Sequence, residues 1–205
     1  MTLWHSARGH LIQSITCEGV LKAIAWHPEG TAFASGGFDA AITVWKADPE
    51  GEKCAEEIVW RNELENLAAD CRSLAYSADG TKLVSGDWAD KVILWEAATG
   101  EKIWEVDCPE EKHYFAVAFS PEMDVVVAGG WDWRATMIRV ADREVLDNMY
   151  IGAETEDHVG GQTVRNIRFS PDGTQIAFCS DDRTVHFWDR DDKTRLPAGA
   201  EEDVE

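Results

Sequence analysis

The sequence has few basic residues for its length. It carries 19 Lys and Arg against 39 Asp and Glu among 205 residues, which gives a formal net charge of −20. Nucleic acids and anionic membrane surfaces are bound mainly through clustered Lys and Arg. The charge balance therefore argues against both kinds of partner and favours partners that are basic or apolar.

Long apolar runs and paired cysteines are also missing. The longest apolar runs, around residues 115–119 and 125–128, have the length of a strand, whereas a membrane-spanning helix needs about 20 residues. The N-terminus lacks the basic-then-apolar order of a secretory signal. The five cysteines are scattered and contain no CxxC pair. We therefore expect reduced thiols, no disulfide framework and a cytoplasmic or nuclear location.

Motifs of known catalytic sites are absent. The chain has no G-x-S-x-G, H-E-x-x-H, P-loop or G-x-G-x-x-G pattern. Its six histidines fall in no metal-ligand spacing, and the acidic segment 189–192 lacks the glycine and the distal Glu of a calcium loop. The sequence thus predicts a protein that is not an enzyme and that binds no cofactor and no metal.

What the sequence does contain is a repeat. Four segments of 26 residues align without a gap, and they begin at Leu21, Cys71, Tyr114 and Val164. Each segment divides into three strand-length pieces separated by turn residues, such as the Ser-Pro-Asp-Gly sequence at 170–173. A fourth strand-length piece follows three of them. Four short antiparallel strands per 43–50 residues are typical of a β-propeller blade, so the sequence predicts an all-β fold.

Over residues 1–190 this repeat resembles the WD-repeat family. The Ser-Pro-Asp-Gly turn, a Ser-Gly step, an Asp in the next turn and the closing Trp-Asp pair at 188–189 match its pattern. In that family a His, a Ser or Thr, the turn Asp and the Trp form a hydrogen-bonded chain within a blade. The residues that match this blade motif are Ser35, Asp39, Trp45, Ser85, Trp95, Asp132, Asp182 and Trp188.

No repeat carries the complete motif. Ala89 takes the place of the turn Asp in the second repeat, and Ile138 takes the place of the Trp in the third. Ala128 and Phe178 replace the Ser in the third and fourth repeats, and the His is missing at the expected distance in all four. We therefore expect apolar packing between blades to contribute more to stability than this hydrogen-bonded chain.

The ends of the chain predict an incomplete ring of about four and a half blades. The expected divisions are 1–19 for the outer part of a preceding blade, 20–190 for four blades (20–66, 67–109, 110–159 and 160–190), and 191–205 for an acidic, disordered tail. The family usually closes a ring of about seven blades. We expect blades of a parent protein or a second chain to complete the ring, and we favour the parent protein because the chain starts at a third strand.

One repeated position predicts a partner-binding surface. The residue before the turn Asp position is Phe38, Trp88, Trp131 or Asp181, and Trp133 follows two residues after Trp131. The resemblance places this turn on the top face, where partners of the family commonly bind. Turns favour small polar residues, and exposed aromatic residues are typical of interfaces. The alternative is that these rings pack over the neighbouring blade as local core.

A second repeated position holds Lys22, Arg72, Phe115 and Arg165, and the resemblance places it near the top mouth of the central channel. Three cations there could bind an acidic or phosphorylated peptide, or they could pair with nearby Asp and Glu. Together these features predict a non-catalytic scaffold that binds proteins or peptides through the top face. The alternative is a substrate-recognition subunit of a larger enzyme complex such as a ubiquitin ligase.

Overall fold

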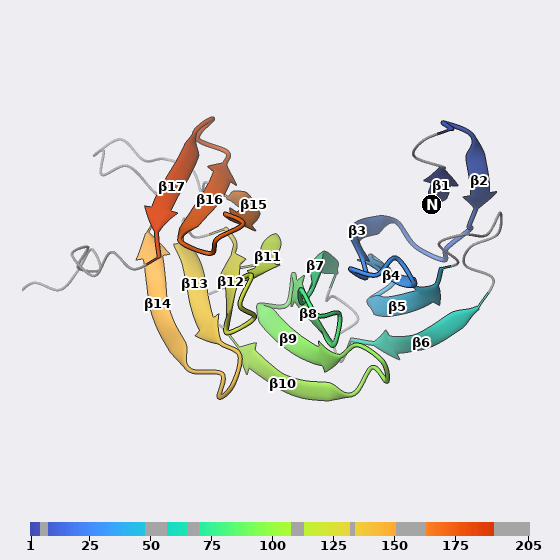
Figure 1. Ribbon diagram of the computed structural model, residues 1–205, viewed down its shortest axis with the longest axis horizontal. Coiled ribbons are helices and arrows are strands. Elements are labelled where there is room, and N and C mark those ends of the chain that lie inside the picture. Colours follow the sequence, from blue (N-terminus) through green and yellow to red (C-terminus); the bar gives the residue numbers. More distant parts are fainter. Residues whose placement is uncertain are drawn as a thin grey trace, which may run out of the picture.

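A computed structural model of the chain describes residues 1–4, 8–47, 57–64, 70–107, 113–131, 134–150 and 163–190. These residues form strands β1 to β17 and no helix, so the expected all-β fold is confirmed. The sheets follow one another around an open arc, with a gap between β1–β2 and β15–β17 (Figure 1). Within the described part of the chain, no helix is long and apolar enough to cross a membrane.

Three four-stranded antiparallel sheets make up the middle of the arc, and each has the strand order of a propeller blade. The first blade contains β3 (Leu21–Trp26), β4 (Ala32–Gly37), β5 (Ala41–Lys46) and β6 (Ile58–Glu63). The second contains β7 (Cys71–Tyr76), β8 (Lys82–Asp87), β9 (Lys91–Glu96) and β10 (Lys102–Asp107). The third contains β11 (Ala116–Phe119), β12 (Val125–Gly129), β13 (Arg134–Arg139) and β14 (Val145–Tyr150).

Smaller sheets lie at the two ends of the arc. A hairpin of β1 (Thr2–Trp4) and β2 (Leu11–Ser14) precedes the first blade. The fourth blade contains β15 (Val164–Phe169), β16 (Gln175–Ser180) and β17 (Val185–Asp189). The blade boundaries expected at 66, 109 and 159 and the tail 191–205 lie outside the described residues and stay predictions.

Equivalent side chains form the interface between every pair of successive blades. At the first interface, Ile42 and Val44 from the third strand of one blade pack in one cluster with Leu74 from the first strand of the next. At the second, Val92 and Leu94 pack with Val117. Ala135 and Met137 pack with Ile167 at the third interface. The period-2 pattern of the third strand thus provides each blade with an apolar face for its neighbour.

Tryptophans of the outer strands add a hydrogen bond across two of these interfaces. The indole Nε1 of Trp60 in β6 donates to the carbonyl of Ala97 at 2.8 Å, and Trp104 in β10 donates to the carbonyl of Val140 at 2.9 Å. Both rings are buried. Each bond links one blade to the next, and neither tryptophan belongs to the family's blade motif.

The blade motif is present in part. Trp45 donates to the hydroxyl of Ser35 and Trp95 to the hydroxyl of Ser85, both at 2.9 Å. The fourth blade has a different His–Asp contact, which the family's motif does not predict. There His186 Nε2 lies 2.7 Å from the carboxylate of the turn residue Asp182, although no His stands at the family's usual place. Asp132 lies outside the described residues.

Ala89, which replaces the turn Asp in the second blade, lines a cavity of about 160 Å³ together with Asp87, Lys91 and Trp95. Asp87 is buried, and its carboxylate accepts the backbone N–H of Lys91 at 2.9 Å. Burial raises the pKa of Asp87 to about 6, against the opposing effect of hydrogen bonds from the backbone of Lys91 and Ala89. The missing turn carboxylate is therefore partly replaced by a buried acid two residues earlier.

Candidate functional site

Both repeated positions singled out from the sequence lie at the same end of each blade. The first two strands of a blade are antiparallel, with Leu21 opposite Gly37 in the first blade. The residue that follows Leu21 is therefore close to the turn that follows Gly37. We call this side of the arc, which carries the turns between second and third strands, the top face.

Cations and aromatic rings alternate across the top face. Lys22 Nζ lies 4.7 Å from the ring centre of Phe38, and the guanidinium carbon of Arg72 lies 5.3 Å from the same ring. Arg72 also lies 4.6 Å from Trp88 and 5.4 Å from Phe115, and Arg165 lies 5.0 Å from Phe115. These are cation–π distances. The six residues Lys22, Phe38, Arg72, Trp88, Phe115 and Arg165, which we call the top-face band, join all four blades.

Carboxylates hold two of the three cations in place. Arg72 Nη2 donates to Asp70 at 2.7 Å. Arg165 donates through Nε at 2.9 Å and Nη2 at 2.8 Å to the two oxygens of Asp181, and these bonds lower the pKa of Asp181. Lys22 makes no ion pair with any residue that the structure describes. Pairing with neighbouring acids therefore accounts for both arginines, and Lys22 is left as the one unneutralised cation among the described members of the band.

His113 extends the band toward Trp131. Its ring stacks on Trp88 with centroids 4.2 Å apart and an interplanar angle of 6°, and it meets Trp131 at 6.1 Å. Its Nδ1 lies 2.8 Å from the carbonyl of Trp88 and 3.0 Å from the carboxylate of Asp90. His113 lies out of register with the family's His position, so the sequence alone does not point to this role.

Exposure divides the aromatic residues of this face into two groups. Phe38 and Trp131 are 48% and 45% exposed, whereas Trp88 and Phe115 are half-buried under the contacts just described. The alternative that these rings are local core therefore fits Trp88 and Phe115 better than Phe38 and Trp131. Trp133 lies outside the described residues. Phe38 and Trp131 are thus the rings of this face that are best placed to contact a partner.

Outside the top-face band, the described residues contain one polar cluster that resembles a catalytic arrangement. No group of three or more His, Cys, Asp and Glu is arranged there to hold a metal ion. Thr184, His186 and Asp182 form a hydroxyl–imidazole–carboxylate cluster, but Thr184 and Asp182 both contact Nε2 of His186. A hydrolytic triad uses the two ring nitrogens separately, so this cluster is a structural link within the turn.

The family described as "WD domain, G-beta repeat" matches residues 5–46, 64–96 and 153–189. The chain belongs to this family. The matched ranges leave out most of the third blade, where Ala128 and Ile138 replace the family's Ser and Trp. That WD-repeat blade nevertheless forms a complete four-stranded sheet, because its buried strand pattern is intact.

Curated relatives of this WD-repeat chain include three with long alignments. Protein HIR1 of Yarrowia lipolytica is 25% identical over 182 residues, which cover 82% of this chain and 17% of the relative. THO complex subunit 3 of Arabidopsis thaliana is 26% identical over 120 residues, covering 58% and 36%. A guanine nucleotide-binding protein subunit beta of Zea mays is 26% identical over 196 residues, covering 90% and 47%. The chain therefore spans less than half the length of each.

Proposed function

We propose that this chain is a non-catalytic interaction module that binds partner proteins or peptides through the top-face band and Trp131. The observation that carries the proposal is the alternation of cations and rings across all four blades. Two of the relatives are named as subunits of larger assemblies, which supports a role in binding other proteins. We place this activity in the cytoplasm or the nucleus.

The band is suited to binding because it is already ordered. Arg72 is fixed by Asp70 and by three rings, so its side chain loses little freedom when a partner arrives. Phe38 and Trp131 offer exposed rings on either side of this ordered centre. Lys22 adds a charge for an acidic residue of the partner. We infer that a partner places apolar side chains on the two rings and a carboxylate near Lys22.

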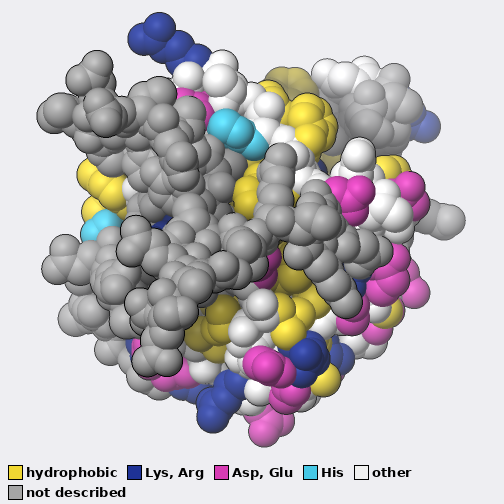
Figure 2. Space-filling model, turned by 90° about the vertical axis from the view of Figure 1, so that its left-hand side faces the viewer, with side chains coloured by type: hydrophobic (Ala, Val, Ile, Leu, Met, Phe, Trp, Pro, Cys, Tyr) yellow, Lys and Arg dark blue, Asp and Glu magenta, His cyan; other side chains and the backbone are white. Residues whose placement is uncertain are grey.

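The ends of the arc support a second part of the proposal, in which further blades from a parent protein or a second chain complete the ring. Val185 and Phe187 of β17 are exposed, whereas the equivalent residues of the other blades are buried against a neighbour. Hydrophobic side chains also reach the surface among charged ones on the side of the arc that carries β14 and β17 (Figure 2).

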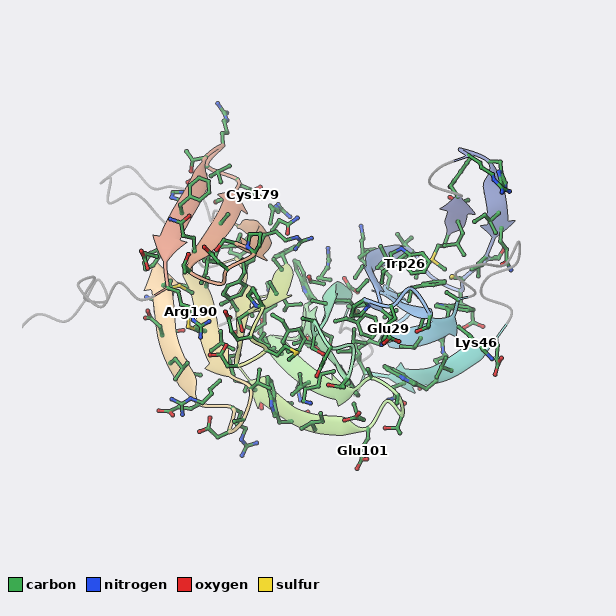
Figure 3. All side chains as sticks on the ribbon, in the orientation of Figure 1. Trp26, Glu29, Lys46, Glu101, Cys179 and Arg190 are labelled. Carbon is green, nitrogen blue, oxygen red and sulfur yellow. The ribbon has the colours of Figure 1, made fainter. Side chains whose placement is uncertain are left out.

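Affinity purification with matched variants tests the binding face. Trp131→Ala and Phe38→Ala should each lower the recovery of a bound partner, by about 5- to 100-fold in affinity for a hot spot. Trp26→Ala is the control, because Trp26, which is labelled in Figure 3, is half exposed and ends β3, whereas Lys22 of the band lies near the start of that strand. If Trp26→Ala removes partners and the other two do not, the binding face is wrong. Recovery of a ligase adaptor would identify the alternative function.

A further inference from the structure

The hairpin β1–β2 forms a two-stranded sheet beside the first blade, whereas the first blade has four strands among the described residues. Figure 1 shows β1 on the inner side of β2, toward the open interior of the arc. Among the described residues, β2 is the only strand paired with β1. A groove of about 720 Å³ lies on this side, lined by Met1 and Thr2, by the link from Ser14 to Gly19 and by β3.

β1 is the equivalent of the third strand of a blade. Its sequence Thr2-Leu3-Trp4 corresponds to Thr43-Val44-Trp45 in β5, and each strand pairs with an outer strand, β2 or β6. In the first blade, β5 is also paired on its inner side with β4, where Ser35 lies opposite Thr43. The groove beside β1 therefore lies where an inner strand lies in the complete blades.

The backbone of β1 is oriented for such a strand. Met1 and Ile15 exchange two hydrogen bonds of 2.8 Å, so the polar groups of Met1 point toward β2. Backbone groups of successive residues in a strand point to opposite sides. The amide and carbonyl of Thr2 therefore point toward the groove, in the position from which Thr43 pairs with Ser35.

Trp4 differs from the equivalent tryptophan of a complete blade in its exposure and in its hydrogen bond. Its ring is 60% exposed, whereas the equivalent Trp95 is 5% exposed. The indole of Trp95 donates to Ser85 of the inner strand at 2.9 Å, whereas the indole of Trp4 has, among the described residues, a single bond of 3.3 Å to Thr2. A hydroxyl on an incoming strand would give Trp4 the acceptor that its equivalent already has.

The opposite wall of the groove carries an exposed apolar side chain. Ile24 of β3 is 53% exposed, whereas its equivalents Leu74, Val117 and Ile167 are 8%, 1% and 0% exposed. Those three are covered by the preceding blade. A strand in the groove that carries a small apolar side chain would cover Ile24 in the same way.

We propose that this groove binds an extended segment of a partner chain, which adds to β1 as an antiparallel strand. The segment carries small apolar residues and a Ser or Thr opposite Thr2, and that hydroxyl accepts the indole N–H of Trp4. Backbone hydrogen bonds to β1 provide the affinity, and the hydroxyl and the small side chains provide the specificity. This site meets the top-face band only at Lys22, which lines the groove, and the proposal does not depend on the band.

A synthetic peptide that copies residues 81–87, Thr-Lys-Leu-Val-Ser-Gly-Asp, tests the proposal with the full chain. We expect saturable binding by calorimetry and a shift of the Trp4 indole resonance, assigned with Trp4→Phe. Replacing the peptide's Ser by Ala should weaken binding about five-fold, the effect of one hydrogen bond. With Trp4→Phe, which keeps the ring but removes the donor, the Ser and Ala peptides should bind equally.

Methylated peptides supply the matched control. The Ser amide faces β1 in this register and the Val amide beside it faces away. N-methylation of the Ser amide should therefore weaken binding by more than about five-fold, because the methyl group removes a backbone hydrogen bond and also stands between the two strands. N-methylation of the Val amide should leave binding within about two-fold, because that amide makes no bond to β1. Equal effects of the two methyl groups, or no binding of the unmodified peptide, would overturn the proposal. A concentration-dependent dimer without peptide binding would instead assign the groove to a second copy of the chain.

Discussion

The second and fourth blades carry equivalent apolar faces in different surroundings. Val92 and Leu94 of β9 are both 0% exposed, while the equivalent Val185 and Phe187 of β17 are 58% and 66% exposed. All four follow the same period-2 pattern. The repeat therefore determines which side chains need to be buried, but the next blade provides the burial. A blade of this kind is stable as part of a row, and the last blade of a row needs a further surface.

Shortening an apolar side chain on each of these faces should give the largest difference in stability between the two blades. Leu94→Ala should lower the free energy of unfolding by about 2–5 kcal/mol, because it leaves a cavity in a buried interface. Phe187→Ala should lower it by less than about 1 kcal/mol, because most of that ring is already in water. Urea unfolding of both variants measures the difference. Equal losses would mean that Phe187 is covered in solution, and the contrast between the blades would disappear.

The pH dependence of stability should also differ between the blades. In the second blade the pKa of Asp87 is raised to about 6, so the unfolded chain releases this proton at a lower pH than the folded chain. The free energy of unfolding should therefore fall by an amount on the order of 2–3 kcal/mol as the pH rises from about 4 to about 6. Asp87→Asn should remove that fall in urea titrations across this range.

Asp182 in the fourth blade should change the free energy of unfolding with pH in the opposite direction to Asp87. Burial disfavours its ionised form, but hydrogen bonds from Thr184 and His186 outweigh this effect and lower its pKa. Its stabilising contribution should therefore be present above the pKa of the unfolded state and be lost as the pH falls through the folded value. An Asp182→Asn variant that gained stability at neutral pH would contradict this assignment.

A smaller effect is expected at the hydrogen bond between the second and third blades. Trp104→Phe removes the donor to the carbonyl of Val140 and keeps most of the buried ring. We expect a loss of about 1–2 kcal/mol in thermal or urea unfolding. Trp26→Phe, at a half-exposed ring without an indole bond to any described residue of another blade, should change stability by less than about 0.5 kcal/mol.

The smallest difference concerns the two ion pairs of the top face. Arg72 and Asp70 have side chains that are 19% and 22% exposed, whereas those of Arg165 and Asp181 are 51% and 40% exposed. Double-mutant cycles should give a coupling below about 1 kcal/mol for the fourth-blade pair, and salt should weaken it further. The Arg72–Asp70 coupling should be larger and less sensitive to salt. The reverse order would mean that rings do not shield Arg72.

The sequence predicted the blades well because the repeat fixes strands, turns and buried faces together. The third blade shows this clearly: it lacks the family's Ser and Trp at 128 and 138, yet its strands occur where the repeat places them. The apolar positions of a strand depend only on period and register, and these survive the loss of polar motif residues.

The sequence predicted the residues of the candidate site but not the contacts between them. The aromatic and cationic positions were found separately, because their contact depends on the pairing of Leu21 with Gly37 and on the closeness of neighbouring blades. His113 and His186 were missed for a different reason. Each reaches a turn carboxylate from outside the family's usual position, and one sequence does not show which His contacts which Asp. Trp60 and Trp104 lay beyond the aligned segments.

The tryptophan hydrogen bonds between blades also predict the order in which the blades unfold locally. The residue of β14 equivalent to Trp104 is Asp147, so the described part of the chain has no equivalent indole-to-carbonyl bond between the third and fourth blades. Among the described residues, Arg190 crosses this junction instead and pairs with Glu122 and Asp124 (Figure 3). Ion pairs weaken with salt, whereas indole-to-carbonyl bonds do not. Amide protons of β15–β17 should therefore exchange earliest among the blades, and sooner still in concentrated salt, while the middle of the arc keeps its protons.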